Sequence, residues 1–160
     1  VVEELSDMEV SSLRYNLGAT FFQQLAGSQE DHKLAKEHME ESLRLETELH
    51  GDESPACATA LNNLALLLEA QGKYDEAKPL YERAIKFDEK ALGPDHPHLA
   101  RDVNNLAGLL HRQGKYDEAK PLYERAIKIN EKAHGPDHPH LAMAINNLAT
   151  LFEDQGKYDE

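Results

Sequence analysis

Histidine is the residue type in this sequence whose spacing most invites a chemical role. Two motifs, His96-Pro97-His98 and His138-Pro139-His140, each place two histidines two residues apart, in a chain of nine histidines and one cysteine. Structural zinc takes four converging ligands, and catalytic zinc takes three and a water molecule. Each motif supplies only two ligands, so we expect no metal site and no cofactor. His96 and His138 are instead expected to help helices start.

The carboxylates and the cysteine form no arrangement that is typical of catalysis. Asp75-Glu76 and Asp117-Glu118 open predicted helices, where acidic side chains interact favourably with the helix dipole. Cys57 occupies the register of Leu99 and Leu141 in later copies of a repeat, which predicts a small buried hydrophobic residue. The sequence also holds no glycine-rich phosphate loop and no nucleophile elbow. We therefore expect no catalytic residues and no enzymatic activity.

The charge and hydropathy of the chain exclude two classes of partner. The 160 residues include 17 Lys+Arg and 30 Asp+Glu, a formal net charge of −13, which argues against a nucleic-acid binder. The longest apolar run, Leu64 to Leu68, is too short to cross a membrane. The first residues lack the features of a signal peptide, and a start at Val1 instead of Met is typical of an excised fragment. These features, with a single cysteine, predict a cytoplasmic protein.

An internal repeat is the main signal in the sequence. The sixteen residues from Gln71 to Lys86 recur unchanged from Gln113 to Lys128, an offset of 42. The tetrapeptide Asn-Asn-Leu-Ala recurs with the same spacing at 62–65, 104–107 and 146–149. We expect a single domain with a degenerate repeat at 12–53, complete repeats at 54–95 and 96–137, and a partial repeat at 138–160, which holds a first helix and the start of a second.

Each repeat is predicted to hold two amphipathic helices. Apolar residues at Leu61, Leu64, Ala65 and Leu68 follow helical spacing, and a similar pattern follows Ala77. In the repeat at 54–95 we expect a first helix from about 55 to 71 with Ser54 as its cap, and a second from about 74 to 91 that ends before Gly-Pro. A proline about five residues into each second helix, at position 79 or 121, predicts a slight bend.

These positions carry a resemblance to a known family. Leu61-x-x-Leu64-Ala65, Leu68, Gly72-x-Tyr74-x-x-Ala77, Tyr81 and Ala84 resemble a tetratricopeptide (TPR) repeat. The 42-residue unit with Asn-Asn-Leu-Ala and Gly-Pro-Asp-His-Pro is similar to the kinesin light chain and nephrocystin-3-like subtype. The resemblance implies an all-α fold, a right-handed α-solenoid of antiparallel helix pairs. HEAT repeats have a similar period, but the small residues at TPR spacing disfavour them.

The first helix of each repeat has one face that varies between copies. At 100° per residue the recurring apolar positions cover one arc of the helix, and the opposite arc differs from copy to copy. An asparagine stands beside that arc in every copy. The resemblance implies that these positions face the concave groove of the solenoid and bind a peptide. The predicted groove residues are Thr59, Asn63, Leu66, Ala70, Arg101, Asn105, Gly108, Arg112, Met143, Asn147 and Thr150.

Two polar features of this face indicate what it would bind. Carboxamides at Asn63, Asn105 and Asn147 can pair with the main chain of an extended peptide, a role that the resemblance also implies. The alternative is that they tie adjacent helices together or lie in water. Arg101 and Arg112 lie about 16 Å apart along one helix face and could select an acidic side chain or a C-terminal carboxylate. The alternative for them is ordinary solvation.

The sequence therefore predicts a protein–protein interaction scaffold. We expect it to bind an extended peptide segment of a partner protein in its concave groove, as a kinesin-light-chain-like cargo or adaptor module; an acidic ligand stays one of the two alternatives given for Arg101 and Arg112. The alternative is a structural spacer or self-assembly module with no peptide ligand. Its basis is that Leu141, Ile145, Leu148 and Phe152 lack the second helix of their repeat, which would favour end-to-end association.

Overall fold

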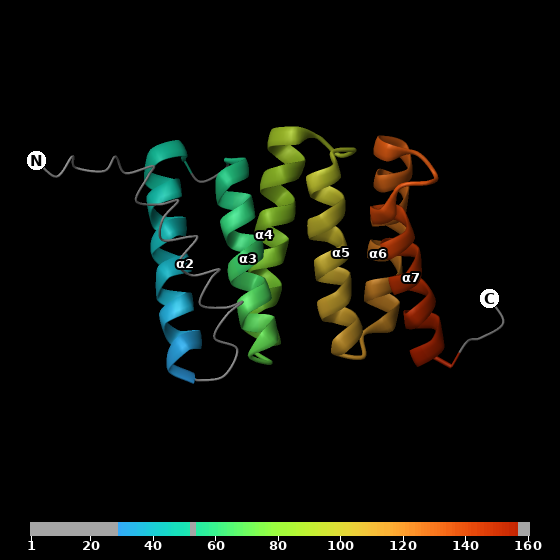
Figure 1. The fold of residues 1–160 in the computed structure, drawn as a ribbon, viewed down its shortest axis with the longest axis horizontal. Helices are drawn as coiled ribbons and strands as arrows, with labels where there is room; N and C mark the ends of the chain where they lie inside the picture. The colour runs from blue at the N-terminus through green and yellow to red at the C-terminus, as the bar shows by residue number, and fades with distance from the viewer. Residues whose placement is uncertain (1–28, 52–53, 157–160) are drawn as a thin grey trace, which may run out of the picture. The chain divides into compact units, whose positions relative to one another are not determined.

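The computed structural model describes residues 29–51 and 54–156, and within these ranges every regular element is an α-helix (Figure 1). The residues from 12 to 28 that were assigned to the first repeat, and the last four of the chain, lie outside the described part. None of the described helices is long and apolar enough to cross a membrane. The helices are α2 (Gln29–His50), α3 (Pro55–Ala70), α4 (Tyr74–Leu92), α5 (Pro97–Arg112), α6 (Tyr116–His134) and α7 (Pro139–Asp154).

The predicted helix pairs are confirmed. The helices expected at 55–71 and 74–91 occupy Pro55–Ala70 and Tyr74–Leu92. The prolines at 79 and 121 lie inside α4 and α6, whose helical assignment continues through both positions. The bend expected there stays a prediction.

The helix boundaries follow from caps and glycines. The Ser54 side chain accepts a hydrogen bond from the Cys57 backbone N–H, and the ring nitrogens Nδ1 of His96 and His138 accept one from the backbone N–H two residues later, at 3.2 Å. The expectation that these two histidines start helices is therefore confirmed. Gly72 has a φ of 73°, a left-handed conformation that favours glycine and turns the chain from α3 into α4.

The chain divides into two compact units, residues 1–87 and 88–160. In the first unit, a core cluster joins Cys57, Ala58 and Leu61 of α3 to Ala84 and Phe87 of α4. Cys57 is fully buried, as its register predicts. Side chains of α2 extend this core, and α2 packs on α3.

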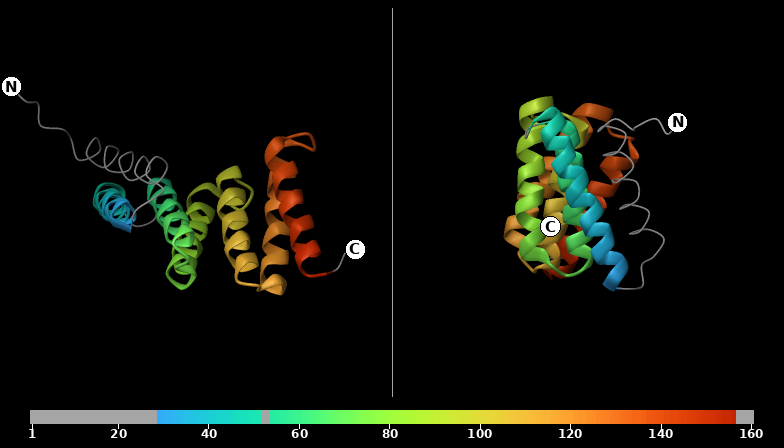
Figure 2. Two further views of the ribbon diagram at one scale, coloured as in Figure 1. Left: turned by 60° about the horizontal axis from the view of Figure 1, so that its bottom comes forward. Right: turned by 90° about the vertical axis from the view of Figure 1, so that its left-hand side faces the viewer.

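In the second unit, α6 packs against both α5 and α7, and the three helices run side by side (Figure 2). The core is built from the repeating apolar positions, which are nearly all inaccessible to solvent. They include Leu99, Val103, Leu106, Leu109, Leu110, Ala119, Tyr123, Ala126, Ile129, Leu141, Ala144 and Leu151.

Candidate functional site

The predicted groove residues fall in both units. Thr59, Asn63 and Leu66 are half-buried on α3, and Ala70 is exposed at its end. In the second unit, six of the seven predicted residues line two pockets between α5 and α7. Arg101 and Met143 line one pocket; Gly108, Arg112, Asn147 and Thr150 line the other. The seventh, Asn105, is half-buried on α5 and is not among the residues that line these two pockets.

The first pocket has a volume of about 380 Å³ and lies where α5 and α7 begin and α6 ends. Its walls are largely apolar, with Pro97, Ala100, Met143 and Ala144 among them. The polar residues that line it are His98, Arg101, Asn104, Asn130, His134 and His140. This pocket can therefore take an apolar group next to hydrogen-bonding partners.

The second pocket has a volume of about 400 Å³ and lies where α5 and α7 end and α6 begins. Arg112, Asn147, Tyr116 and Tyr123 line it together with His111 and Asp154, whose side chains are hydrogen-bonded at 2.8 Å. Its remaining lining residues are Gly108 and Thr150. A guanidinium group, a carboxamide and phenol rings together can recognise an acidic or carboxamide-bearing group.

Gly108 keeps the second pocket open. A Cβ atom at this position would lie 3.6 Å from the Tyr123 Oη and 3.7 Å from Arg112 Nη1. The missing side chain therefore leaves space between the α5 backbone and the two polar groups that a ligand would meet. This variable position lines the pocket because α5 presents it to the tyrosine of α6.

Arg101 has a structural partner that sequence reasoning missed. Its Nε and Nη2 both lie 2.9 Å from Oδ1 of Asp102, a carboxylate with no solvent exposure. Asp88 is equally buried. Burial raises the pKa of Asp102 to about 7; Arg101 opposes that rise, and Asp88 adds to it. The signal was present in the repeat, since Asp102 stands where Ala60 and Ala144 stand in other copies.

Of the three predicted peptide-binding asparagines, Asn63, Asn105 and Asn147, at least one forms a hydrogen bond within the protein. The Asn147 side chain donates from Nδ2 to Oδ1 of Asn104 at 3.0 Å, which ties α7 to α5. Asn104 is the first asparagine of its Asn-Asn-Leu-Ala tetrapeptide, and its counterpart in the preceding repeat, Asn62, is 2% exposed. Asn147 can still contact a ligand, because it also lines the second pocket.

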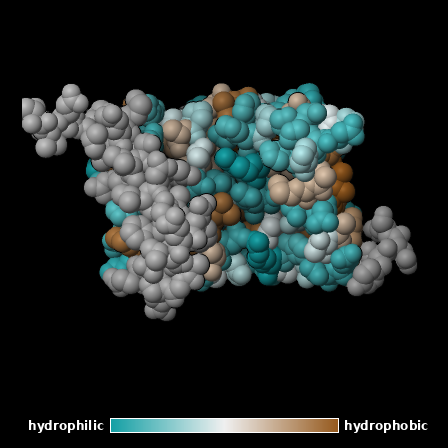
Figure 3. Space-filling view, in the orientation of Figure 1, coloured by the Kyte–Doolittle hydropathy of each residue, from teal (hydrophilic) through white to brown (hydrophobic). Residues whose placement is uncertain are grey.

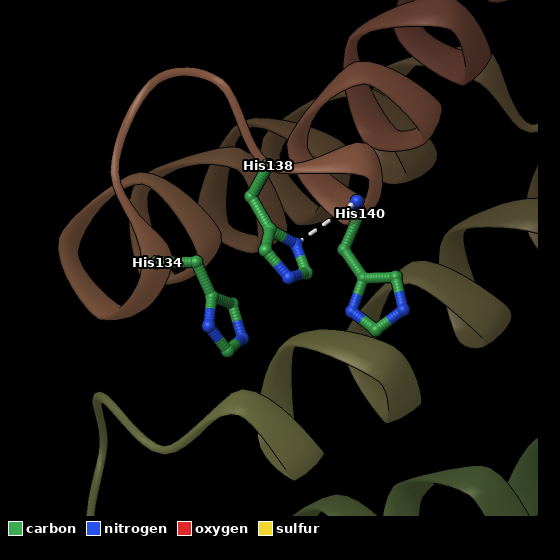
Figure 4. Close-up of side chains that lie close together, drawn as sticks. All are labelled: His134, His138 and His140. Atoms are coloured by element: carbon green, nitrogen blue, oxygen red, sulfur yellow. Dashed lines mark hydrogen bonds between the residues drawn. The ribbon is translucent and has the colours of Figure 1, made fainter.

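Three histidines come together at the start of α7 (Figure 4). The ligand atoms of His134, His138 and His140 all lie within 4.8 Å of one another. The pKa of His138 is lowered, first by burial and then by repulsion from the other two rings. Sequence reasoning counted two histidines in this loop. It missed His134 because this residue ends the preceding helix, and the loop brings it back onto the motif.

The repeat and the helix pairs agree with the comparisons to known proteins. The tetratricopeptide repeat family model matches residues 9–90 and 99–160. The chain belongs to the TPR family. No curated protein sequence matches it.

Solved structures of kinesin light chain-like TPR proteins share the fold. BtubC (BKLC) from P. vanneervenii has a TM-score of 0.84 and 22% identity, over 98% of this chain and 61% of that chain. A putative kinesin light chain of Podosopora anserina with nearly identical TPR-like repeats has a TM-score of 0.79 and 22% identity, over 96% of this chain and 70% of that chain. This TPR chain thus spans less than two thirds of the BtubC chain. The likeness establishes an all-α TPR solenoid fold.

Proposed function

We propose that this TPR chain is a cytoplasmic scaffold that binds an extended peptide segment of a partner protein along the faces of α5 and α7. TPR repeats generally mediate protein–protein interaction. The observation that carries the proposal is the second pocket, where three variable positions, Gly108, Arg112 and Thr150, and the recurring Asn147 meet two tyrosines of α6. Variable positions are released from the packing that every repeat must maintain, so they can serve a ligand.

The chemistry of this pocket supports an acidic ligand. Arg112 is exposed and reaches into a space lined by Asn147, Thr150 and the two tyrosines. A guanidinium group can hold a carboxylate through two parallel hydrogen bonds. The chain as a whole carries a net charge of −13, so Arg112 would be a favoured contact for an acidic peptide. The carboxylate that lines this pocket, that of Asp154, is paired with His111 at 2.8 Å. A kinesin-light-chain-like cargo or adaptor role fits this mode of recognition.

The experiment that tests the proposal compares two charge reversals. A peptide library is selected on the wild-type protein, and the affinity of a selected acidic peptide is measured by fluorescence polarisation. Arg112→Glu is expected to weaken binding at least about tenfold, the cost of losing one charge-assisted hydrogen bond. Lys128→Glu makes the same change of net charge at an exposed position of α6 that lines neither pocket, and should leave binding unchanged.

Two outcomes would contradict the proposal. If Arg112→Glu binds the peptide as tightly as the wild type, the pocket is not the binding site. If both variants lose affinity equally, the peptide responds only to net charge. Arg101 is a poor choice for this test, because its removal would leave the buried Asp102 without its ion-pair partner.

A second candidate function, self-assembly, rests on α7. Ile145 is 49% exposed and Met143 is 50% exposed, and hydrophobic side chains gather over α7 in Figure 3. Exposed apolar surface of this kind can mediate association between copies. Light scattering over a range of protein concentrations tests the idea. Association should be reduced by Ile145→Lys, and a wild-type protein that stays monomeric at all concentrations rules this candidate out.

A further inference from the structure

We propose that His134, His138 and His140 form a binding site for a divalent late transition metal ion, such as Zn²⁺, Ni²⁺ or Cu²⁺. The three side chains converge from the end of α6 and the start of α7 (Figure 4). This site is independent of the proposed peptide binding, which rests on the second pocket.

The loop between α6 and α7 positions the three ligands. His134 is the last residue of α6, His138 is the N-cap of α7 and His140 is the second residue of that helix. Gly135, with a φ of 83°, turns the chain so that the histidine before it faces the two after it. The rings of His134 and His138 stack with centroids 4.1 Å apart, and those of His138 and His140 meet edge-on at 4.9 Å.

The ligand chemistry selects the class of metal. Imidazole nitrogen suits Zn²⁺, Ni²⁺ and Cu²⁺, whereas Mg²⁺ and Ca²⁺ prefer oxygen ligands. At a Zn–N distance of about 2.1 Å, two nitrogens on one ion lie at most about 4.2 Å apart. In a tetrahedral site the nitrogens lie about 3.4 Å apart, closer than the observed limit of 4.8 Å. The stacked rings of His134 and His138, with an interplanar angle of 17°, must therefore rotate to point at one ion, and His134 and His140 are exposed and can turn. Three protein ligands leave a coordination position for water.

The chain contains a matched site that lacks one ligand. The preceding repeat has the same Gly-Pro-Asp-His-Pro-His sequence, and the rings of His96 and His98 meet edge-on at the same 4.9 Å. The residue at the register of His134 in that repeat is Leu92. One repeat therefore offers a pair of histidines and the next offers three. Comparing the two distinguishes the metal affinity of a three-ligand site from the weak affinity of a surface histidine pair.

Metal binding at His138 competes with its role as a helix cap. Its Nδ1 accepts a hydrogen bond from the His140 backbone N–H, so the neutral ring carries its proton on Nε2. A metal ion on Nε2 requires that proton to move to Nδ1, which then cannot accept the bond. A metal ion on Nδ1 displaces the bond directly. Occupancy of the site therefore releases the cap of α7 and couples the metal to the start of that helix.

A cation that lines the same pocket as two of the histidines is already compensated. Arg101 lines the first pocket together with His134 and His140. Its guanidinium group is held 2.9 Å from the buried carboxylate of Asp102, so the ion pair reduces its repulsion of a bound metal ion.

Substitutions that copy other repeats provide the test. His134→Leu reproduces Leu92, and His138→Ser reproduces Ser54, which caps α3 through its own side chain, so this variant loses a ligand and keeps a cap. His96→Ser makes the same change in the two-histidine repeat and serves as the control. Isothermal titration with ZnCl₂ and NiCl₂ uses the chain without a histidine tag, and MgCl₂ is the negative control.

We expect one tight site per wild-type chain for Zn²⁺ and Ni²⁺ and none for Mg²⁺. Loss of even an outer-sphere partner weakens metal sites ten- to a hundredfold, so His134→Leu and His138→Ser should each weaken binding at least about tenfold. His96→Ser should bind as the wild type does. Circular dichroism checks that each variant is folded.

Two results would overturn the proposal. If His134→Leu binds Zn²⁺ as tightly as the wild type, the ion rests on the histidine pair alone. If His96→Ser weakens binding as much as His138→Ser does, the ions are scattered over the surface histidines and no three-ligand site exists.

Discussion

The buried carboxylates Asp88 and Asp102 make the second unit sensitive to pH. Both side chains have no solvent exposure, and three of their four carboxylate oxygens, both of Asp88 and Oδ2 of Asp102, have no hydrogen-bond partner among the described residues. Two ionised carboxylates repel each other, whereas one shared proton converts the repulsion into a hydrogen bond. We expect the pair to hold a proton in the native state under conditions where the unfolded chain has lost it.

The sign and size of the effect follow from the pKa of Asp102. Its native pKa of about 7 lies above the ordinary value of 3.8, so the folded state binds the proton more tightly. The free energy of unfolding therefore falls as the pH rises from about 4 to 7, and this contribution is fully lost above pH 7. At 1.36 kcal/mol per pKa unit, the three-unit difference corresponds to at most roughly 4 kcal/mol.

The variant Asp88→Asn isolates the coupling between the two carboxylates. Asn130 stands at the same register in the next repeat and is buried there, so the repeat accommodates asparagine. Burial is the largest cause of the raised pKa and Asp88 is the smallest, so we assign Asp88 about 1 kcal/mol of the total. The stability advantage of the variant over the wild type should therefore be about 1 kcal/mol larger at pH 8 than at pH 5.

Urea unfolding followed by far-UV circular dichroism at pH 5 and pH 8 measures this difference, with equal m-values as the check that the transition is comparable. Glu82→Gln, an exposed acidic position on α4, is the control and should show no such gain. If the advantage of Asp88→Asn is the same at both pH values, the two carboxylates are not coupled and the reasoning is wrong.

Three further substitutions test the packing that holds the site. Tyr81→Phe removes a buried 2.7 Å hydrogen bond to Glu69 and should cost about 1–3 kcal/mol in urea unfolding, more than Tyr123→Phe at the same register. Ala77→Leu should cost about 1–3 kcal/mol, because this fully buried alanine leaves no room for a larger side chain. Gly108→Ala should raise the melting temperature, with a gain of up to about 1 kcal/mol from helix propensity. It should also weaken binding of the acidic peptide, because the added methyl group takes up space in the second pocket.

The fold could be predicted because successive repeats share the same pattern of buried apolar positions. Every copy must bury one helical face against its neighbours, so the apolar positions recur at an offset of 42 and define the helices to within one or two residues. The caps could be predicted too, since Ser54, His96 and His138 share one register.

The candidate site could be predicted only in part, because helical angles give the face of a residue and not its partner. They placed Arg101 and Arg112 on one face, and both line pockets. They could not show that Arg101 pairs with Asp102, or that Asn147 bonds Asn104 in the preceding repeat. These contacts depend on side-chain reach and on the spacing between helices, which no single helical wheel contains.

The departures from the repeat explain why the three unusual features of the second unit lie where they do. Relative to the copy at 54–95, Asp102 replaces an alanine, and His134 and Gly108 each replace a leucine. Each substitution occurs in a framework that the other copies already stabilise, so the fold can carry a buried carboxylate, a third histidine or an open pocket. A position that breaks the repeat without breaking the fold is therefore the place to look for function, and Asp102→Ala, His134→Leu and Gly108→Leu each restore the residue of the copy at 54–95.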